Sequence, residues 1–303
     1  MSINTSFKVS GGSTVISGGG LVVQAVGGPA FNPLTAFGTG QCLLWLDANQ
    51  GLFQDLALSP SATVSSPVTA DGQFVGMWKD QSGNANHAIT GAYRNGTPNY
   101  DTAPTARVNT GSSAYSQYAA KGPGVIFYGG SPAPAPVGNQ GYYTKLEIWS
   151  LASRAESAKT PISIIAAYEN HGSASGSNPH VVDHADQYLG IKSTGYSGAY
   201  NGSTTSDVYR PSDSAFVHGV VYDHPAGWTL AEFVNGVAKG TASGGYAFDN
   251  TLFDQNNAVN LGRGQYSQQN MAGAIYEVLI YNKALSAQEM LDVSTYLKAK
   301  WGI

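Results

Sequence analysis

Three polar segments place tyrosine beside amides and charged side chains, a combination suited to binding sugars. They run over residues 91–101, 193–210 and 262–270, and the candidate ligand-binding residues in them are Tyr93, Tyr196, Tyr200, Asn201 and Tyr266. A tyrosine offers a flat apolar ring for stacking and a hydroxyl group for hydrogen bonding. The alternative is that these tyrosines only cover the loops that carry them. The occurrence of three such segments in one chain adds weight to glycan binding.

A candidate cation site lies in the segment DQSGN at residues 80–84. Asp80, Ser82 and Asn84 carry oxygen atoms at alternate positions, as calcium-binding loops do, although no bidentate glutamate follows. We name Asp80 and Asn84 as candidate calcium ligands, and calcium is the cofactor that this segment suggests. We favour the other interpretation, in which Asp80 caps a turn by accepting backbone N–H groups.

Histidine and aspartate also gather after residue 179. This group consists of His180, Asp183, His184 and Asp186. In an extended strand three of them, His180, His184 and Asp186, point to the same side, where they could bind zinc. We favour the alternative, in which these residues form a polar strand end. A weaker group of the same kind consists of His218, Asp223 and His224.

Short apolar or alternating segments, separated by turn residues, fill the chain from residue 41 onward. They lie at residues 41–48, 74–89, 124–129, 142–153, 160–169, 180–193, 215–224, 258–264 and 273–282. Asn235-Gly236 predicts a type I′ hairpin turn, because both residues tolerate a positive φ. Many short strands without intervening helices favour a sandwich or a barrel. In the last strand, regular alternation places Ala274, Tyr276, Val278 and Ile280 on one face.

The one predicted helix closes the chain. Ser286 and Glu289 form a capping box, in which each side chain bonds the backbone N–H group of the other residue. An apolar stripe at helical spacing follows, and it consists of Met290, Val293, Leu297 and Trp301. Gly302 is placed to end the helix. We expect the stripe to pack on the edge of the sandwich.

Residues 1–40 have a different character from the rest. Apolar pairs and triplets such as Val15-Ile16 and Leu21-Val22-Val23 alternate with runs of glycine, and such a segment cannot bury its apolar residues alone. It is either a flexible linker or an arm that packs on another subunit or adds a strand to a partner sheet. We favour the arm, because glycine-rich linkers seldom carry such apolar runs. The predicted domains are therefore an assembly arm at residues 1–40 and one domain at residues 41–303.

Two motifs connect residues 41–303 to a known family. The first is LLWLDA (43–48) followed by WKDQSGNANHA (78–88), and the second is VNLGRG (259–264) followed by MAGAIYEVLIYNKALSAQEMLDVSTYLKAKWGI (271–303). With these motifs the chain resembles the concanavalin A-like lectin/glucanase superfamily, in its laminin-G-like jelly-roll branch. The resemblance implies an all-β fold: an antiparallel jelly-roll β-sandwich with one C-terminal helix, preceded by the N-terminal Gly-rich arm.

The resemblance leaves the activity open, because folds of this class carry lectins, glycosidases and structural modules. Laminarinase-type glycosidases of the superfamily use a Glu-x-Asp-x-x-Glu strand, which brings two carboxylates together for hydrolysis. None of the six glutamates of this chain has an aspartate two positions on and a glutamate five positions on. We therefore expect that the protein is not an enzyme.

Composition narrows the choice of partner. The net charge is −4 and the 15 basic residues are scattered, which argues against nucleic acid as a partner. No apolar run reaches the roughly 18 residues of a membrane span, so we expect no membrane insertion. The single cysteine, Cys42, lies among apolar residues and is expected to be a buried thiol. Residues 1–10 show no signal peptide, so we expect folding in a reducing host cytoplasm.

Together these features predict a carbohydrate- or receptor-binding module of a phage or phage-like particle, as a fibre, spike or decoration protein. It would sit on the surface of a virion or extracellular particle and bind a surface polysaccharide or glycan receptor. The arm would join other particle proteins, and we expect a homo-oligomer. The alternatives are a structural decoration protein without a ligand and a polysaccharide-degrading enzyme.

Overall fold

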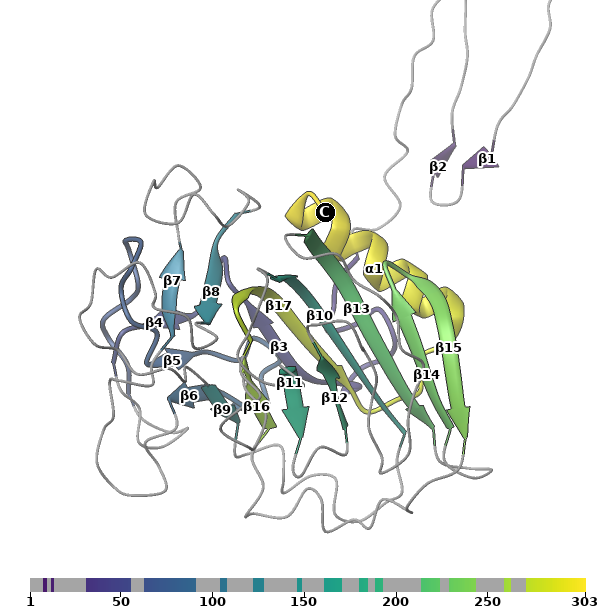
Figure 1. Ribbon diagram of the computed structural model, residues 1–303, viewed down its shortest axis with the longest axis horizontal. Helices are drawn as coiled ribbons and strands as arrows, with labels where there is room; N and C mark the ends of the chain where they lie inside the picture. Colours follow the sequence, from purple (N-terminus) through teal and green to yellow (C-terminus); the bar gives the residue numbers. More distant parts are fainter. Residues whose placement is uncertain are drawn as a thin grey trace, which may run out of the picture. The chain divides into compact units, whose positions relative to one another are not determined.

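The computed structural model describes residues 8–9, 12–13, 31–55, 63–90, 104–107, 122–127, 146–148, 161–170, 180–184, 189–192, 214–223, 229–243, 259–262 and 271–303. The chain divides into two compact units, Met1–Asn32 and Pro33–Ile303. The first contains the short antiparallel strands β1 (Lys8–Val9) and β2 (Gly12–Ser13). The second unit contains the two large sheets and the helix (Figure 1).

The larger sheet of the second unit has eight strands. In spatial order these are β15 (Val237–Ser243), β14 (Thr229–Val234), β13 (Ser214–Asp223), β10 (Ile162–Asn170), β17 (Gly273–Tyr281), β8 (Gly124–Phe127) and β7 (Thr105–Arg107), with β3 (Cys42–Asp47) also paired to β17. The beginning of β17 pairs with β8 and its remainder with β3. Strand β17 is therefore the central strand that holds the two parts of this sheet together.

The second sheet has seven shorter strands. Their spatial order is β12 (Leu189–Lys192), β11 (His180–His184), β16 (Val259–Leu261), β9 (Leu146–Ile148), β6 (Ala88–Thr90), β5 (Met77–Trp78) and β4 (Leu52–Phe53). Every strand pairing in both sheets is antiparallel.

The two sheets form a sandwich, because each has apolar side chains that only the other sheet can shield from water. Gly262, which follows β16, lies directly against the ring of Phe127 on β8 of the other sheet. The predicted antiparallel sandwich with one C-terminal helix is confirmed. The sandwich unit already begins before residue 41, the predicted domain boundary, and the ring of Phe37 packs edge-on against that of Tyr281 at 5.0 Å.

Strand β17 departs from the predicted alternation. Its register with β10 shifts between Ala167 and Tyr168, which pair with Glu277 and Ile275, so that Tyr276 is an extra residue in the strand. Such a bulge reverses the alternation from that point on. The prediction that Ala274, Tyr276, Val278 and Ile280 share one face is therefore wrong. The Tyr276 ring faces the helix, where it stacks on Trp301 at 5.4 Å, whereas Val278 alternates with Glu277 and points into the sandwich.

The C-terminal helix α1 (Ala287–Trp301) forms as predicted. Both hydrogen bonds of the capping box between Ser286 and Glu289 are present, and Gly302 ends the helix in the left-handed conformation. The buried stripe includes all four predicted apolar residues, Met290, Val293, Leu297 and Trp301. It covers the outer face of the larger sheet, where the Met290 side chain lies directly against Gly219. No described helix has the length and hydrophobicity of a membrane span.

The hairpin between β14 and β15 is attached to this helix. Asn235 and Gly236 both have a positive φ, at 53° and 81°, as the predicted type I′ turn requires. Gly236 lies against Leu291 and Ser294 of α1, where a side chain would collide with both. Glycine is therefore needed at this position for both the turn and the packing.

Replacing Trp301 by alanine is expected to destabilise the fold by about 3–5 kcal/mol, because it removes a fully buried aromatic side chain. Trp301 is only 2% exposed. The measurement is the free energy of unfolding in urea. Leu291→Ala on the same helix is the control, since Leu291 is 41% exposed and its loss should change stability little. Equal effects of the two variants would contradict the packed helix.

Candidate functional site

The predicted carbohydrate-binding residues Tyr93, Tyr196, Tyr200, Asn201 and Tyr266 lie outside the described residues. The strands that precede them in the chain are described, however. Strand β6 ends at Thr90, β12 at Lys192 and β16 at Leu261, and all three belong to the seven-stranded sheet.

These three strands run in the same direction. Strands β12 and β16 are both antiparallel to β11, which lies between them, and β16 and β6 are both antiparallel to β9. Their last residues therefore lie at one end of the sheet, and the segments that carry the five candidate residues begin there. Strand β11 begins at this same end, because His180 pairs with Lys192. The structure thus brings together the starting points of three segments that are far apart in the sequence.

A row of polar side chains crosses the seven-stranded sheet close to this end. Asp183 on β11 pairs with Asn260 on β16, which in turn pairs with Glu147 on β9. Residues directly opposite each other in antiparallel strands point to the same face, so the three side chains are neighbours. All three are buried, with 0%, 7% and 4% of their surface exposed. We call this set the polar row.

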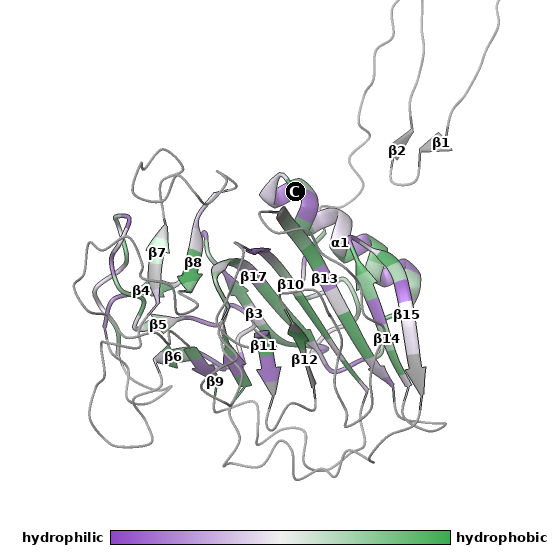
Figure 2. Ribbon diagram, viewed as in Figure 1, coloured by the Kyte–Doolittle hydropathy of each residue, from purple (hydrophilic) through white to green (hydrophobic). Residues whose placement is uncertain are grey.

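The same row continues across the sheet with apolar residues. Glu147 pairs with Ile89, Ile89 with Met77, and Met77 with Phe53. Ile89, Met77, Phe53 and Val64 form a hydrophobic cluster. In Figure 2 strand β6 has mainly hydrophobic colour, whereas β9 and β11 combine hydrophilic and hydrophobic colours.

The polar row lies on the face of the sheet that is turned away from the sandwich interior. The residues that alternate with it, Val182, Leu261 and Leu146, are apolar and fully buried. In a sandwich the apolar side chains of the two sheets pack against each other in the interior. The sequence pattern did not indicate the row, because it places one polar residue in each of three strands from distant parts of the chain.

His180 extends the polar row. Its Nδ1 atom lies 2.7 Å from Oδ1 of Asp183, and both side chains are almost fully buried. No described residue forms a hydrogen bond with His180 Nε2. Of the predicted zinc group, the structure brings His180 and Asp183 together, while the His184 side chain and Asp186 lie outside the description. Among the described side chains, no three His, Cys, Asp or Glu residues are placed to hold a metal ion.

A second histidine–carboxylate pair lies in the larger sheet. His218 Nε2 on β13 is 2.9 Å from Oε1 of Glu232 on β14, and both side chains are buried. Sequence reasoning grouped His218 with Asp223, but alternation along β13 directs these two residues to opposite faces. The partner on the next strand is found only through the register, in which Val220 pairs with Glu232.

The Asp80 segment forms a tight turn that joins the two sheets. One carboxylate oxygen of Asp80 accepts the backbone N–H groups of Trp45 and Ser82, and the other accepts the N–H of Asn86 and the Ser82 hydroxyl. Since Trp45 belongs to β3 of the larger sheet and Asp80 follows β5 of the smaller one, these bonds fasten one sheet to the other. This is the turn-capping role that the sequence favoured for Asp80 over a cation ligand.

Asn84 contributes its amide nitrogen to the same turn. Asn84 Nδ2 donates to the backbone carbonyl oxygens of Cys42 and Leu43, at 2.9 and 3.2 Å. A calcium ion at Asp80 and Asn84 stays a prediction, and it would have to compete with the four donors that Asp80 already accepts. Cys42 is buried, as expected, and burial raises the pKa of its thiol to about 12.

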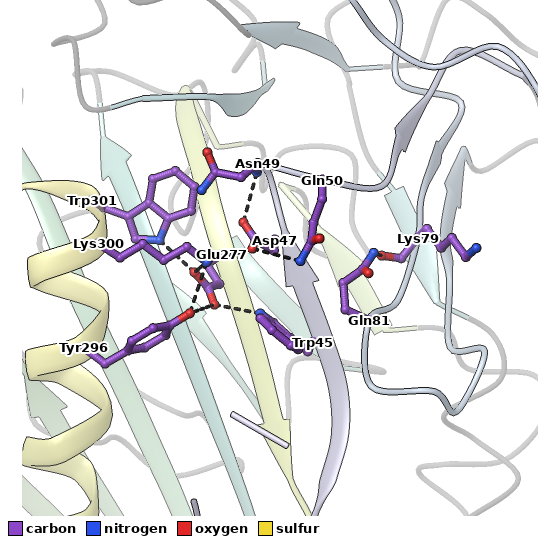
Figure 3. Close-up of polar contacts among 10 residues, drawn as sticks. All are labelled: Trp45, Asp47, Asn49, Gln50, Lys79, Gln81, Glu277, Tyr296, Lys300 and Trp301. Atoms are coloured by element: carbon purple, nitrogen blue, oxygen red, sulfur yellow. Dashed lines mark hydrogen bonds and ion pairs between the residues drawn. The ribbon is translucent and has the colours of Figure 1, made fainter. Parts of the chain in front are cut away.

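The most extensive polar network surrounds Glu277 on β17 (Figure 3). Its Oε1 accepts hydrogen bonds from Nε1 of Trp45, at 2.8 Å, and from the hydroxyl of Tyr296, at 3.3 Å. Its Oε2 accepts from Nε1 of Trp301, at 2.8 Å, and from Nζ of Lys300, at 2.7 Å. The donors come from β3 and α1, so this network fastens the helix to the sheet.

Lys300 also bonds Asp47, with its Nζ 2.8 Å from Oδ2. Asp47 in addition accepts the backbone N–H of Asn49 and the Gln50 side chain. Burial raises the pKa of Glu277, and the positive charge of Lys300 opposes this rise. Burial lowers the pKa of Lys300, but the two carboxylates outweigh it and keep the pKa above its usual value. Because all these charges are paired within the chain, the network has a structural role.

Comparison with known proteins identifies the family. Residues 134–290 match the family described as the concanavalin A-like lectin/glucanases superfamily, and this stretch is a little more than half of the chain. The chain therefore belongs to this superfamily, with a laminin-G-like domain. No curated protein matches it in sequence.

Several solved structures have a similar fold. Domain 4 of AbnA, a GH43 extracellular arabinanase from Geobacillus stearothermophilus in complex with arabinotriose, is 12% identical with a TM-score of 0.47, over 84% of this chain and 98% of that domain. The binding domain of botulinum neurotoxin serotype C1 is 11% identical with a TM-score of 0.47, and the match covers 85% of this chain and 52% of that structure. Trypanosoma rangeli sialidase in complex with sialic acid is 12% identical with a TM-score of 0.44, and the match covers 86% of this chain and 33% of the sialidase.

Calcium binding at Asp80 and Asn84 can be tested by thermal unfolding. If the ion is bound, EDTA should lower the melting temperature and an excess of calcium should restore it, because a ligand that binds only the folded state stabilises that state. Magnesium serves as the control cation. If neither EDTA nor calcium shifts the transition, the turn is held by its hydrogen bonds alone.

Proposed function

We propose that this protein is a non-catalytic carbohydrate- or receptor-binding module. The observation that carries the proposal is the common direction of β6, β12 and β16, which starts the three tyrosine-bearing segments at one end of one sheet. A sugar-binding site needs several aromatic and amide side chains within the span of one ligand, and segments with a common starting edge are placed to supply them. Membership of a superfamily that includes lectins supports this function.

The site would bind each sugar weakly. Sugar hydroxyl groups exchange hydrogen bonds with water for bonds with the protein, and the net gain of each bond is small. Stacking of tyrosine rings would provide much of the remaining affinity. Useful attachment then requires several linked copies that bind at once, which agrees with the expected homo-oligomer.

We place this module on a phage or phage-like particle, as a fibre, spike or decoration protein that attaches the particle to a host surface polysaccharide. The arm at residues 1–40 is proposed to join other particle proteins. The apolar pairs and triplets of the arm and the single buried cysteine support this placement. The division of the chain at Asn32 and Pro33 is consistent with an arm that is a unit of its own.

Replacing both Tyr196 and Tyr200 by alanine is expected to weaken binding to the host polysaccharide by roughly tenfold to a hundredfold, the effect of losing two aromatic contacts. Binding can be measured on a glycan array and on host cells. The double phenylalanine variant is the matched control, because it retains both rings and should keep most of the affinity. If the alanine variant binds as the parent does, the site lies elsewhere. If the parent binds no glycan, the protein is a structural component without a ligand.

Deleting residues 1–32 is expected to leave the sandwich folded and to abolish oligomer formation or docking to the particle. The second compact unit begins at Pro33, so this deletion spares Phe37 and its contact with Tyr281. Light scattering after size-exclusion chromatography measures the oligomeric state, and a melting curve reports the fold. Unchanged assembly without the arm would contradict this role.

A further inference from the structure

The polar row has a composition that packing alone does not require. On the neighbouring strands β6 and β5 the same row holds Ile89 and Met77, which are fully buried in a hydrophobic cluster. At Asp183, Asn260 and Glu147 the chain instead buries two carboxyl groups and an amide, which costs free energy unless they form hydrogen bonds. Local departures from good packing chemistry of this kind are expected at functional sites.

His180 provides a second and independent indication of a ligand. Its side chain is only 3% exposed, and its Nδ1 atom lies 2.7 Å from Oδ1 of Asp183, which places the ring beside the polar row. Its Nε2 atom has no hydrogen-bond partner among the described residues. A buried nitrogen without a partner is costly, so a group that is not part of the described chain is the natural partner for it.

We propose that the polar row and His180 form the floor of the carbohydrate site and hydrogen-bond the hydroxyl groups of a sugar. This inference rests on the proposed function and names the residues that would recognise the ligand. The carboxylates of Asp183 and Glu147 accept hydrogen bonds, the amide of Asn260 both donates and accepts, and the imidazole of His180 can do either. Neighbouring strands are about 4.8 Å apart, a spacing within the span of one sugar ring. The row also lies at the end of the sheet where the three tyrosine segments begin.

The first test replaces Asn260 at the centre of the row and, separately, its neighbour Glu147. Asn260→Ala and Glu147→Gln are each expected to weaken binding by roughly tenfold, the effect of one strong hydrogen bond. The probes are neutral oligoglucans, oligogalacturonate and sialylated oligosaccharides on one array, followed by titration with the tightest of them. Asn282→Ala is the matched control, since Asn282 is an exposed asparagine just after β17. Asn260→Asp, which keeps the size of the side chain, replaces the alanine variant if the latter does not fold.

The second test uses the parent protein and so does not depend on the stability of a variant. Saturation with the tightest oligosaccharide should shift the ¹⁵N resonance of His180 Nε2. His218 is the internal control, because it is also buried beside a carboxylate but lies on the larger sheet. Its resonances should not move.

The outcomes separate the two proposals. The tyrosine variant could lose binding while Asn260→Ala binds normally and the His180 signal does not change. That result would contradict the role of the polar row as the floor of the site, but it would leave the proposal of carbohydrate binding intact. A parent protein that binds no oligosaccharide would overturn the proposed function itself. Release of reducing sugar by the parent, abolished in Glu147→Gln, would show that the row hydrolyses its ligand and would overturn the non-catalytic role.

Discussion

The buried carboxylate of Glu277 is the constraint on which the arrangement of the sandwich and its helix depends. A carboxylate removed from water costs several kcal/mol unless its oxygen atoms are fully matched by donors. Glu277 is fully buried and accepts hydrogen bonds from four side chains, two indoles, a phenol and an ammonium group. One donor comes from β3 and three come from α1. The helix cannot leave the sheet without leaving a buried charge unpaired, so helix and sheet fold as one unit.

The same region explains how β3 is held. On one side β3 pairs with β17, and its Trp45 donates to Glu277. On the other side the Asp80 turn accepts the backbone N–H of Trp45, while Ser82, Asn84 and Asn86 donate to the carbonyl oxygen of Leu43. Because the turn belongs to the smaller sheet, β3 connects the two sheets through hydrogen bonds as well as through apolar packing. The predicted cation site and the structural joint of the sandwich are thus the same turn.

Antiparallel pairing also determines where a binding site can form. In a sheet in which every neighbour is antiparallel, alternate strands run the same way and end at the same edge. Strands β12, β16 and β6 occupy alternate positions in the seven-stranded sheet, so segments from three distant parts of the sequence begin side by side. The polar row crosses the sheet near that edge. In many binding domains a rigid sheet positions the loops, and the loops carry the residues that contact the ligand.

The sequence alone determined the elements whose causes are local. The capping box at Ser286, the apolar stripe of the last helix and the Asn235-Gly236 turn depend on residues within a few positions of one another, and each forms as expected. The two family motifs likewise predicted the sandwich. The candidate tyrosines were also found in the sequence, but they lie outside the described residues, and their role stays a prediction.

Only the tertiary structure decided the features that depend on register between distant segments. Asp183, Asn260 and Glu147 become one row because each pairs with its neighbour on the adjacent strand. His218 lies beside Glu232 rather than Asp223, again because of the register between neighbouring strands. The bulge at Tyr276 follows from the pairing of β17 with β10, and it turns Tyr276 toward Trp301. A shift of one residue in register moves a side chain to the opposite face, and residue spacing within a single strand contains no information about that shift.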